Sequence, residues 1–307
     1  MTEEIIGAVT LNLEKYAGVD AYSDGDIEDY LLEIVKENGD IDYTETILKN
    51  ASWPVLYHLS GMRENIVSWY PFQEDDEVLE IGAGCGAVTG ALIRSCKSVT
   101  ALDLSLRRCR INAHRHNTAS NLNIIVSSFM DALPLLHQKY SCVTLIGVLE
   151  YSKLYIGGQE PFVRFLSHVK GLLKPGGKVL IAIENRLGMK YFAGTQEDHL
   201  GVPMRGIEGY QKTDNVQTFS RKELQSICEQ AGFEQLKFYY PYPDYKFPDV
   251  IYSDEYLPQR GELTRNTRNF DSDRYVLFNE SAAFDGIIDA GLFQEFSNSF
   301  FVEAKGG

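Results

Sequence analysis

The sequence predicts a doubly wound α/β fold, and three observations carry that prediction. Short apolar runs rich in β-branched residues alternate with segments of helical periodicity through the middle of the chain. One run passes directly into a glycine-rich turn at 82–86, and a helical segment follows. The 307 residues are 44% hydrophobic, enough to bury a sizeable core. Strands that alternate with helices form a parallel sheet covered on both faces.

The chain before the sheet is expected to be a helical N-terminal extension over residues 1–70. Acidic and apolar side chains recur at helical spacing around 27–32, and a second helix is predicted near 63–69.

The sheet and its helices are predicted over residues 71–240. Strands are expected at 77–81, 98–103, 123–126, 142–148 and 178–184. Helices are expected at 88–95, 106–116 and 161–173. Ser220, with Glu223 three residues later, predicts a capping box for a further helix, and a strand at 233–240 follows it.

The end of the chain breaks the alternation. Residues 241–296 mix aromatic, proline and charged residues irregularly, which predicts a cap or lid inserted between two strands. Residues 297–307 are expected to supply the final strand.

Composition narrows the classes of partner and location. The net charge of −14 repels phosphate backbones, so nucleic acid is not expected as a partner. The five cysteines include no CxxC pair, which indicates reduced thiols rather than a disulfide framework. The acidic start lacks a signal-peptide pattern, and no apolar run is long enough for membrane insertion. The sequence therefore predicts a cytoplasmic protein.

The glycine turn predicts a ligand that meets a helix N-terminus. Glycines allow positive φ and let a ligand approach the backbone, while the helix offers unpaired N–H groups. Gly82, Gly84 and Ala87 also fit the dinucleotide fingerprint, so an NAD(P)-dependent oxidoreductase is an alternative. Glu80 favours a ligand with a positively charged amino group, such as the methionine end of S-adenosylmethionine (SAM).

Two aspartates downstream suit an adenosine-containing ligand. Asp103 ends the second predicted strand, where a carboxylate can accept hydrogen bonds from both ribose hydroxyls. Asp131 follows the third strand and can accept from the adenine amino group, while Phe129 or Met130 covers the ring. Each aspartate has a plainer interpretation as a cap of the following helix.

The end of the fourth strand is the remaining candidate. In a doubly wound sheet the ends of the first and fourth strands border the crevice where ligands bind. Gly147 to Tyr151 are therefore expected beside the reacting group, although Glu150 and Tyr151 can equally be structural.

In this order, these features resemble the class I SAM-dependent methyltransferase family. The resemblance covers roughly residues 78–232. It comprises the E-x-G-x-G-x-G loop from Glu80, Asp103, the Phe-Met-Asp stretch at 129–131, the Leu-Leu-Lys-Pro-Gly-Gly-Lys turn at 172–178, and the Thr-Phe-Ser…Leu…Ala-Gly-Phe helix at 218–233.

The resemblance implies a seven-stranded Rossmann-like sheet whose last strand is antiparallel. It implies SAM as cofactor and S-adenosylhomocysteine as product. The residues expected to bind SAM are Glu80, Gly82, Ala83, Gly84, Asp103, Leu104, Phe129, Met130, Asp131 and Gly147.

The expected chemistry is an in-line methyl transfer to a small molecule, at oxygen. A hydroxyl acceptor needs a proton acceptor nearby, and the catalytic candidates are Glu150, Tyr151 and His199, with Glu184 and Glu208 as further bases. Many related O-methyltransferases carry Leu-Glu-His where this chain has Leu-Glu-Tyr at 149–151, so a non-catalytic partner protein is also an alternative.

No metal is expected, because Asp198 with His199, and Asp271 with Asp273, do not make a convincing ligand set.

Three further stretches, at 57–65, 184–188 and 242–245, resemble bacterial methyltransferases found with cell-surface polysaccharide genes. This resemblance implies polysaccharide biosynthesis and a sugar or sugar-phosphate acceptor. A phosphate would require a cation, for which Arg63, Arg186 and Arg205 are the candidates.

Overall fold

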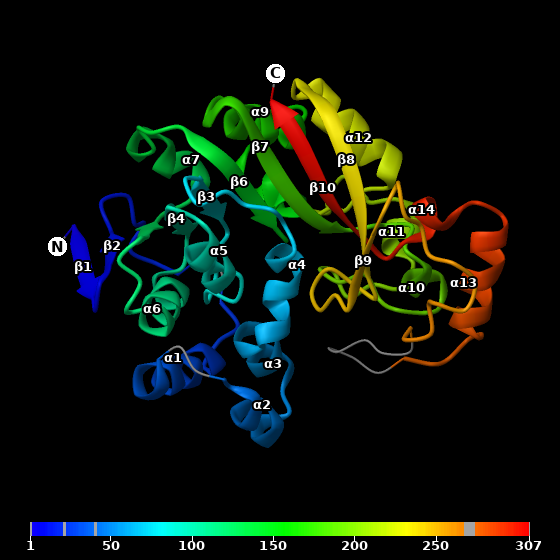
Figure 1. The fold of residues 1–307 in the computed structure, drawn as a ribbon, viewed down its shortest axis with the longest axis horizontal. Helices are drawn as coiled ribbons and strands as arrows, with labels where there is room; N and C mark the ends of the chain where they lie inside the picture. The colour runs from blue at the N-terminus through cyan, green and yellow to red at the C-terminus, as the bar shows by residue number, and fades with distance from the viewer. Residues whose placement is uncertain (1, 21–22, 40–41, 267–273, 307) are drawn as a thin grey trace. The chain divides into compact units, whose positions relative to one another are not determined.

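The computed structural model describes residues 2–20, 23–39, 42–266 and 274–306 (Figure 1). The chain divides into two compact units, one of residues 1–145 with 172–177, and one of residues 146–171 with 178–307. Asp271 and Asp273 lie outside the described residues.

The first unit contains a mainly parallel sheet. Its strands are β1 (Glu3–Ile6), β2 (Val9–Asn12), β3 (Glu77–Ile81), β4 (Ser98–Asp103), β5 (Leu122–Val126) and β6 (Tyr140–Ile146, whose last residue belongs to the second unit). Their order is β1-β2-β5-β4-β3-β6, and every pairing from β2 to β6 is parallel. Apolar side chains fill β3, β4 and β5 because both faces of a parallel sheet are covered.

The first residues of the predicted helical extension form strands instead. β1 and β2 pair as an antiparallel hairpin. Val9 and Leu11 are fully buried while Thr10 and Asn12 are partly exposed, the alternation typical of a half-buried strand. Gly7 turns the hairpin at φ +59°, and a Cβ there would collide with the Asn117 carbonyl. Strands of four residues are so short that the helical spacing seen later in the extension does not rule them out.

The predicted helices of the extension follow that hairpin. The first unit contains α1 (Ile27–Asn38), α2 (Thr44–Asn50), α3 (Trp53–Leu59), the 3-10 turn η1 (Gly61–Glu64), α4 (Asn65–Ser68), α5 (Thr89–Ser95), α6 (Leu106–Arg115), α7 (Phe129–Ala132) and η2 (Leu133–Leu135). Helices α1 to α3 lie together (Figure 1). Their buried apolar side chains pack with Cys85 and Ile111, so the extension packs on the glycine loop and on α6.

A largely buried ion network, in which only Asp24 is exposed, fixes α1 against α6. Arg108 donates from Nε to Glu28 at 2.7 Å and from Nη2 to Asp24 at 2.8 Å. Asp24 also lies 2.7 Å from Nε2 of buried His58. Buried charges are tolerated when they are paired and hydrogen-bonded, which holds for this group.

The second unit contains an antiparallel set of strands. These are β7 (Leu173–Glu184, whose first five residues belong to the first unit), β8 (Phe233–Tyr242), β9 (Val250–Ser253) and β10 (Ser299–Gly306), in the order β7-β10-β8-β9. β10 pairs antiparallel with both β7 and β8. The antiparallel last strand implied by the family resemblance is therefore confirmed, and β1, β2 and β9 are additional to the seven strands expected.

Helices and turns complete the second unit. They are η3 (Leu149–Tyr151), α8 (Ser152–Tyr155), α9 (Pro161–Gly171), α10 (Met189–Phe192), α11 (Arg205–Glu208), α12 (Arg221–Gln230), α13 (Glu280–Asp289) and α14 (Phe293–Phe296). The predicted insertion at 241–296 thus holds β9, α13 and α14, and its role as a lid stays a prediction. Within the described ranges, no helix is long and apolar enough to cross a membrane.

The capping box predicted at the start of α12 is present. The Ser220 hydroxyl accepts from the Glu223 N–H, and the Glu223 carboxylate accepts from the Ser220 N–H at 2.8 Å. Each bond satisfies a donor that would otherwise lack a partner at the helix end.

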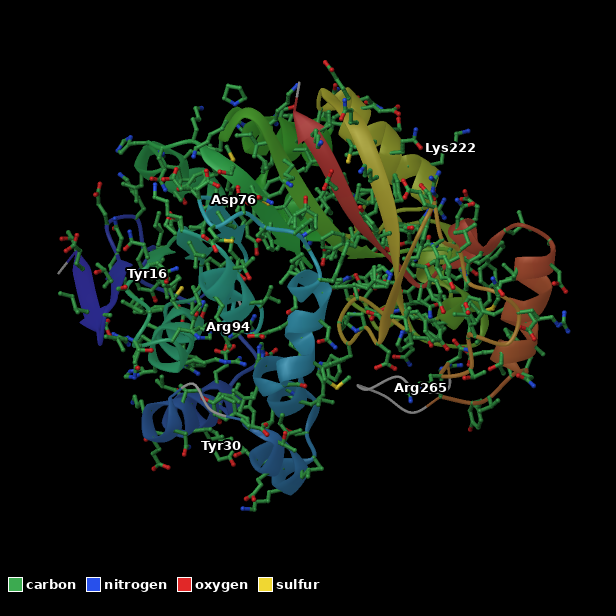
Figure 2. The ribbon with its side chains drawn as sticks, in the orientation of Figure 1. Tyr16, Tyr30, Asp76, Arg94, Lys222 and Arg265 are labelled. Carbon is green, nitrogen blue, oxygen red and sulfur yellow. The ribbon has the colours of Figure 1, made fainter. Side chains whose placement is uncertain are left out.

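Replacing the cap should destabilise the protein measurably. We expect Ser220→Ala to lower the free energy of unfolding by about 1 kcal/mol, measured by urea denaturation. Lys222→Ala is the control, because this exposed side chain extends outward from the same helix (Figure 2) and should change stability by less than about 0.5 kcal/mol. Equal losses in both variants would contradict a capping role.

Candidate functional site

The glycine loop between β3 and α5 is held to the end of β4. The N–H groups of Gly82 and Ala83 both donate to the Leu102 carbonyl, at 2.8 and 3.1 Å. Gly82 and Gly84 have φ of +75° and +52°, conformations that L side chains rarely adopt. A Cβ on Gly84 would meet nothing within 4 Å, whereas one on Gly86 would strike the Asn112 side chain. Gly86 therefore serves packing, and Gly84 borders open space.

Asp103 is oriented by the loop beside that open space. One carboxylate oxygen accepts from the Gly84 N–H at 2.9 Å, and the other accepts from the Ser105 N–H at 2.9 Å. Burial raises the pKa of this carboxyl, although both N–H donors oppose that shift. Each oxygen keeps a lone pair for a further donor, so the group can receive a pair of ribose hydroxyls.

Asp103 does not cap α6. Ser105 is the N-cap, since its hydroxyl accepts from the Arg108 N–H. The carboxylate of Asp20 also accepts from the N–H groups of Leu106 and Arg107, at 2.7 and 3.2 Å. This role of Asp20 was missed from sequence, because 86 residues separate it from Leu106 and no local signal joins them.

Glu80 lies buried on β3, with 4% of its surface exposed. Its carboxylate accepts from the Thr89 hydroxyl at 2.6 Å, and Thr89 accepts from the Asn112 amide at 3.1 Å. Burial raises the pKa of Glu80 to about 8, which the Thr89 hydroxyl only partly offsets. A positively charged ligand group would favour the ionised form.

The predicted adenine residues surround the start of α7. Phe129 is buried, Met130 is half-buried and Asp131 is exposed. Ser128 is the N-cap of this helix: its hydroxyl accepts from the Asp131 N–H and donates to the Asp131 carboxylate at 2.7 Å. Asp131 is thus not the N-cap, and one of its oxygens is engaged by Ser128.

A second group of ionisable side chains lies wholly in the second unit. Glu150 in η3 and Glu184 at the end of β7 are both 0% exposed. His199 Nε2 lies 3.4 Å from Glu184 Oε2 and 3.9 Å from Glu150 Oε1. Its Nδ1 lies 3.0 Å from the Tyr151 hydroxyl. The structure thus brings together all three catalytic candidates, with Glu184, from three separate segments.

Two lysines, one buried and one half-buried, complete this acidic cluster. We define the cluster as Glu150, Glu184, Asp198, His199, Asp244, Lys190 and Lys246. Lys246 is paired with Glu184 and lies 2.7 Å from Asp198. Lys190 lies 2.7 Å from Asp244 and 3.1 Å from Asp198. Sequence reasoning missed both lysines, because neither lies in a recognisable motif.

Within the acidic cluster, the pKa values of the two glutamates are shifted in opposite directions. Burial raises the pKa of Glu150 to about 8. Burial opposes ionisation of Glu184 as well, but Lys246 and His199 hold the pKa of that carboxyl well below its usual range. Burial lowers the pKa of His199, yet Glu184 and Glu150 outweigh it and raise the pKa to about 9. Both oxygens of Glu150 lack a hydrogen-bond partner among the described residues.

The other candidates are placed elsewhere. Glu208 is exposed at the end of α11. Arg186 forms a two-pronged pair with Glu223, and Arg205 lies 3.3 Å from Asp214. The Arg63 guanidinium stacks on the Tyr57 ring at 4.3 Å. All three arginines proposed for a phosphate are thus engaged with other residues.

Comparison with known proteins identifies the family. Residues 59–237, more than half of the chain, match the family described as methyltransferase domain, and the chain belongs to that family. A curated relative, the ubiquinone biosynthesis O-methyltransferase of Hydrogenovibrio crunogenus, is 22% identical over 188 residues, which cover 60% of this chain and 73% of the relative.

Solved structures agree in fold. A SAM-dependent methyltransferase from Archaeoglobus fulgidus superposes with a TM-score of 0.50 at 14% identity, over 82% of this chain and 96% of that one. A chain of a Haloferax volcanii complex that contains the Trm112 methyltransferase activator also gives 0.50, at 15% identity, over 86% and 95%. The fold is therefore the Rossmann-like methyltransferase sheet with extra strands.

The protein is a SAM-dependent methyltransferase, with SAM as cofactor and S-adenosylhomocysteine as product. Family membership decides against the NAD(P)-dependent oxidoreductase considered from the sequence. The first unit fits SAM on its own geometry. Gly84 borders open space, Asp103 keeps acceptor capacity beside it, and Glu80 offers a buried carboxylate to a cationic group.

Glu80 should lower the free energy of unfolding of the ligand-free protein as the pH rises. With a folded pKa of about 8 against an ordinary value of 4.5, the unfolded chain loses this proton first, so stability falls between those values. We expect Glu80→Gln, which can still accept from Thr89, to be more stable than wild type at pH 7 by on the order of 1 kcal/mol or more. Urea unfolding at pH 4, 6 and 8 measures the difference.

Glu77→Gln is the matched control on the same strand. Lys174 and Lys97 lower the pKa of Glu77, so this variant should show no such gain. Parallel pH profiles for wild type and Glu80→Gln would contradict the raised pKa.

Proposed function

We propose that the protein transfers the methyl group of SAM to a hydroxyl oxygen of a small-molecule acceptor, of which a sugar is the preferred class. The observation that carries this proposal is Glu150, a fully buried carboxyl group with no hydrogen-bond partner among the described residues, next to His199. Such a group needs a donor to offset its burial, and an acceptor hydroxyl is one.

The first unit would hold SAM through the residues named from the sequence. Glu80 takes the amino group, and the backbone of Gly82, Ala83 and Gly84 lies against the methionine part. Asp103 and Leu104 hold the ribose. Phe129, Met130 and Asp131 surround the adenine. Gly147, which the sequence also placed beside the ligand, belongs to the second unit.

Bound SAM supplies a methyl group on a sulfonium, which is already a good leaving group. The protein's contribution is to align the acceptor and exclude water, and alignment alone can supply on the order of 7 kcal/mol or more. Glu150 is the proposed proton acceptor for the hydroxyl. His199, held by Tyr151 at 3.0 Å and by Glu184 at 3.4 Å, positions that carboxyl and balances its charge.

Two observations favour an oxygen acceptor without a phosphate. The curated relative is by name an O-methyltransferase. Arg186 and Arg205 are already paired with carboxylates, and Arg63 is stacked on Tyr57. None of these three candidate arginines is therefore available to pair with a phosphate. A sugar hydroxyl also agrees with the resemblance of the stretches at 57–65, 184–188 and 242–245 to methyltransferases found with polysaccharide genes.

Transfer of labelled methyl groups from SAM to a panel of sugars, phenols and amines tests this proposal. We expect label in an ether-linked methyl of a hydroxylated compound. Methylation confined to amines would contradict oxygen as the acceptor atom, and labelled phosphate esters would contradict the argument from the arginines.

Glu150→Gln should reduce kcat by about 100-fold or more, because the amide cannot take the proton. The dissociation constant for S-adenosylhomocysteine, measured by calorimetry, should stay within about twofold of wild type, since the proposed cofactor residues are unchanged. Glu229→Gln, an exposed change on α12, is the control and should retain full kcat. An unaltered kcat in Glu150→Gln would remove Glu150 from the reaction.

A further inference from the structure

We propose that Glu150, Glu184 and His199 form a binding site for one divalent metal ion. One carboxylate oxygen from each glutamate and one ring nitrogen of His199 lie within 4.8 Å of one another. Ligands bound at 2.0–2.2 Å to a shared ion are separated by at most about 4.4 Å, so only small side-chain movements are needed. No metal is expected from the sequence, because 34 residues separate Glu150 from Glu184 and neither sits in a ligand motif.

Glu150 gives an independent reason to expect a ligand. It is fully buried, and neither of its oxygens has a hydrogen-bond partner among the described residues. Leaving a buried polar group unsatisfied destabilises the folded protein, and more so when the group is charged. A metal ion would satisfy this carboxylate where it stands.

The charges of the acidic cluster agree with a divalent cation. Metal ligands bind in their deprotonated forms. With Glu150 ionised and His199 neutral, the four carboxylates Glu150, Glu184, Asp198 and Asp244 are opposed by only two lysines, which leaves two negative charges for the ion to balance. Glu197 adds a further charge, which the N–H groups of His199 and Leu200 and the Tyr210 hydroxyl hold. One divalent ion would balance the surplus of the cluster.

The surroundings also match those of a metal ligand. A ligating histidine usually donates its other ring N–H to an oxygen, which fixes its orientation. Nδ1 of His199 lies 3.0 Å from the Tyr151 hydroxyl and can make that bond. Lys246 holds Glu184 Oε1, which leaves Oε2, the oxygen nearest His199, for the ion. Tyr151 would thus orient the imidazole of His199 toward the ion.

The ligand set indicates the ion and the acceptor. Two carboxylates and an imidazole suit Mn²⁺ or a similar first-row ion, and three protein ligands leave coordination positions open. We infer an acceptor with two neighbouring oxygens, as in a vicinal diol, that chelates the ion. This step rests on the proposed function, whereas metal binding itself does not.

The ion would activate the acceptor hydroxyl. Coordination lowers the pKa of a bound hydroxyl, so its proton can pass to the free oxygen of Glu150. The oxygen's electron pair then forms the bond to the methyl carbon. The carbon–sulfur bond breaks with its electrons going to sulfur, which yields the methyl ether and neutral S-adenosylhomocysteine.

Titration of chelator-treated protein with Mn²⁺, followed by the loss of the free-ion electron paramagnetic resonance signal, tests the site. We expect one ion per chain in wild type. Glu150→Gln and His199→Gln should each weaken binding by more than tenfold. Tyr151→Phe should weaken it by about tenfold, because this change removes only the oxygen that orients the histidine. Glu229→Gln should bind as wild type does. Unchanged binding of S-adenosylhomocysteine shows that each variant is folded.

No bound ion in wild type at millimolar Mn²⁺, or undiminished binding in both Glu150→Gln and His199→Gln, would overturn the site. Methyl transfer that persists fully after chelation would overturn the activating role of the ion and leave the proposed function standing. Mn²⁺ bound at this site, with no transfer to any diol or other hydroxyl compound, would instead defeat the proposed function and leave the site standing.

Discussion

The cost of removing carboxylates from water shapes both units of this protein. Burying a charged group costs about several kcal/mol of free energy unless hydrogen bonds or opposite charges replace its contacts with water. Glu28 meets this cost through Arg108, Asp103 through two backbone N–H groups, and Glu184 through Lys246 and His199. Glu80 and Glu150 are offset only in part, and burial raises the pKa of both to about 8.

The two units use different means to hold their buried carboxylates. Around its glycine loop the first unit uses neutral donors, since Glu80 accepts from Thr89, and Asp103 accepts from Gly84 and Ser105. Neutral donors add no positive charge, so these carboxyl groups can still interact with a cationic or hydroxylated ligand. The second unit uses lysines and a histidine, which set the protonation of neighbouring groups apart. Such separation is typical of sites that move protons or bind metal ions.

Tyr151 stands where the Leu-Glu-His pattern of the resembled O-methyltransferases would place a histidine. The imidazole of this protein comes instead from His199, and Tyr151 lies edge-on to it, with ring centroids 5.3 Å apart. The tyrosine hydroxyl and the Glu184 carboxylate hold opposite nitrogens of the ring. The imidazole beside Glu150 therefore comes from a different chain segment, the loop that contains His199.

Local sequence patterns were enough to predict the features that depend only on residues close together in the chain. The glycine loop, the parallel strands and the capping box of α12 each follow from patterns within about ten residues, because turns, caps and strand periodicity are local. Only the tertiary structure joined Glu150 to Glu184 and His199, and Lys246 to Glu184 across 62 residues. Such pairings arise from how strands and loops pack, and no local spacing encodes them. The β1–β2 hairpin belongs with them, since β2 is held by its pairing with β5.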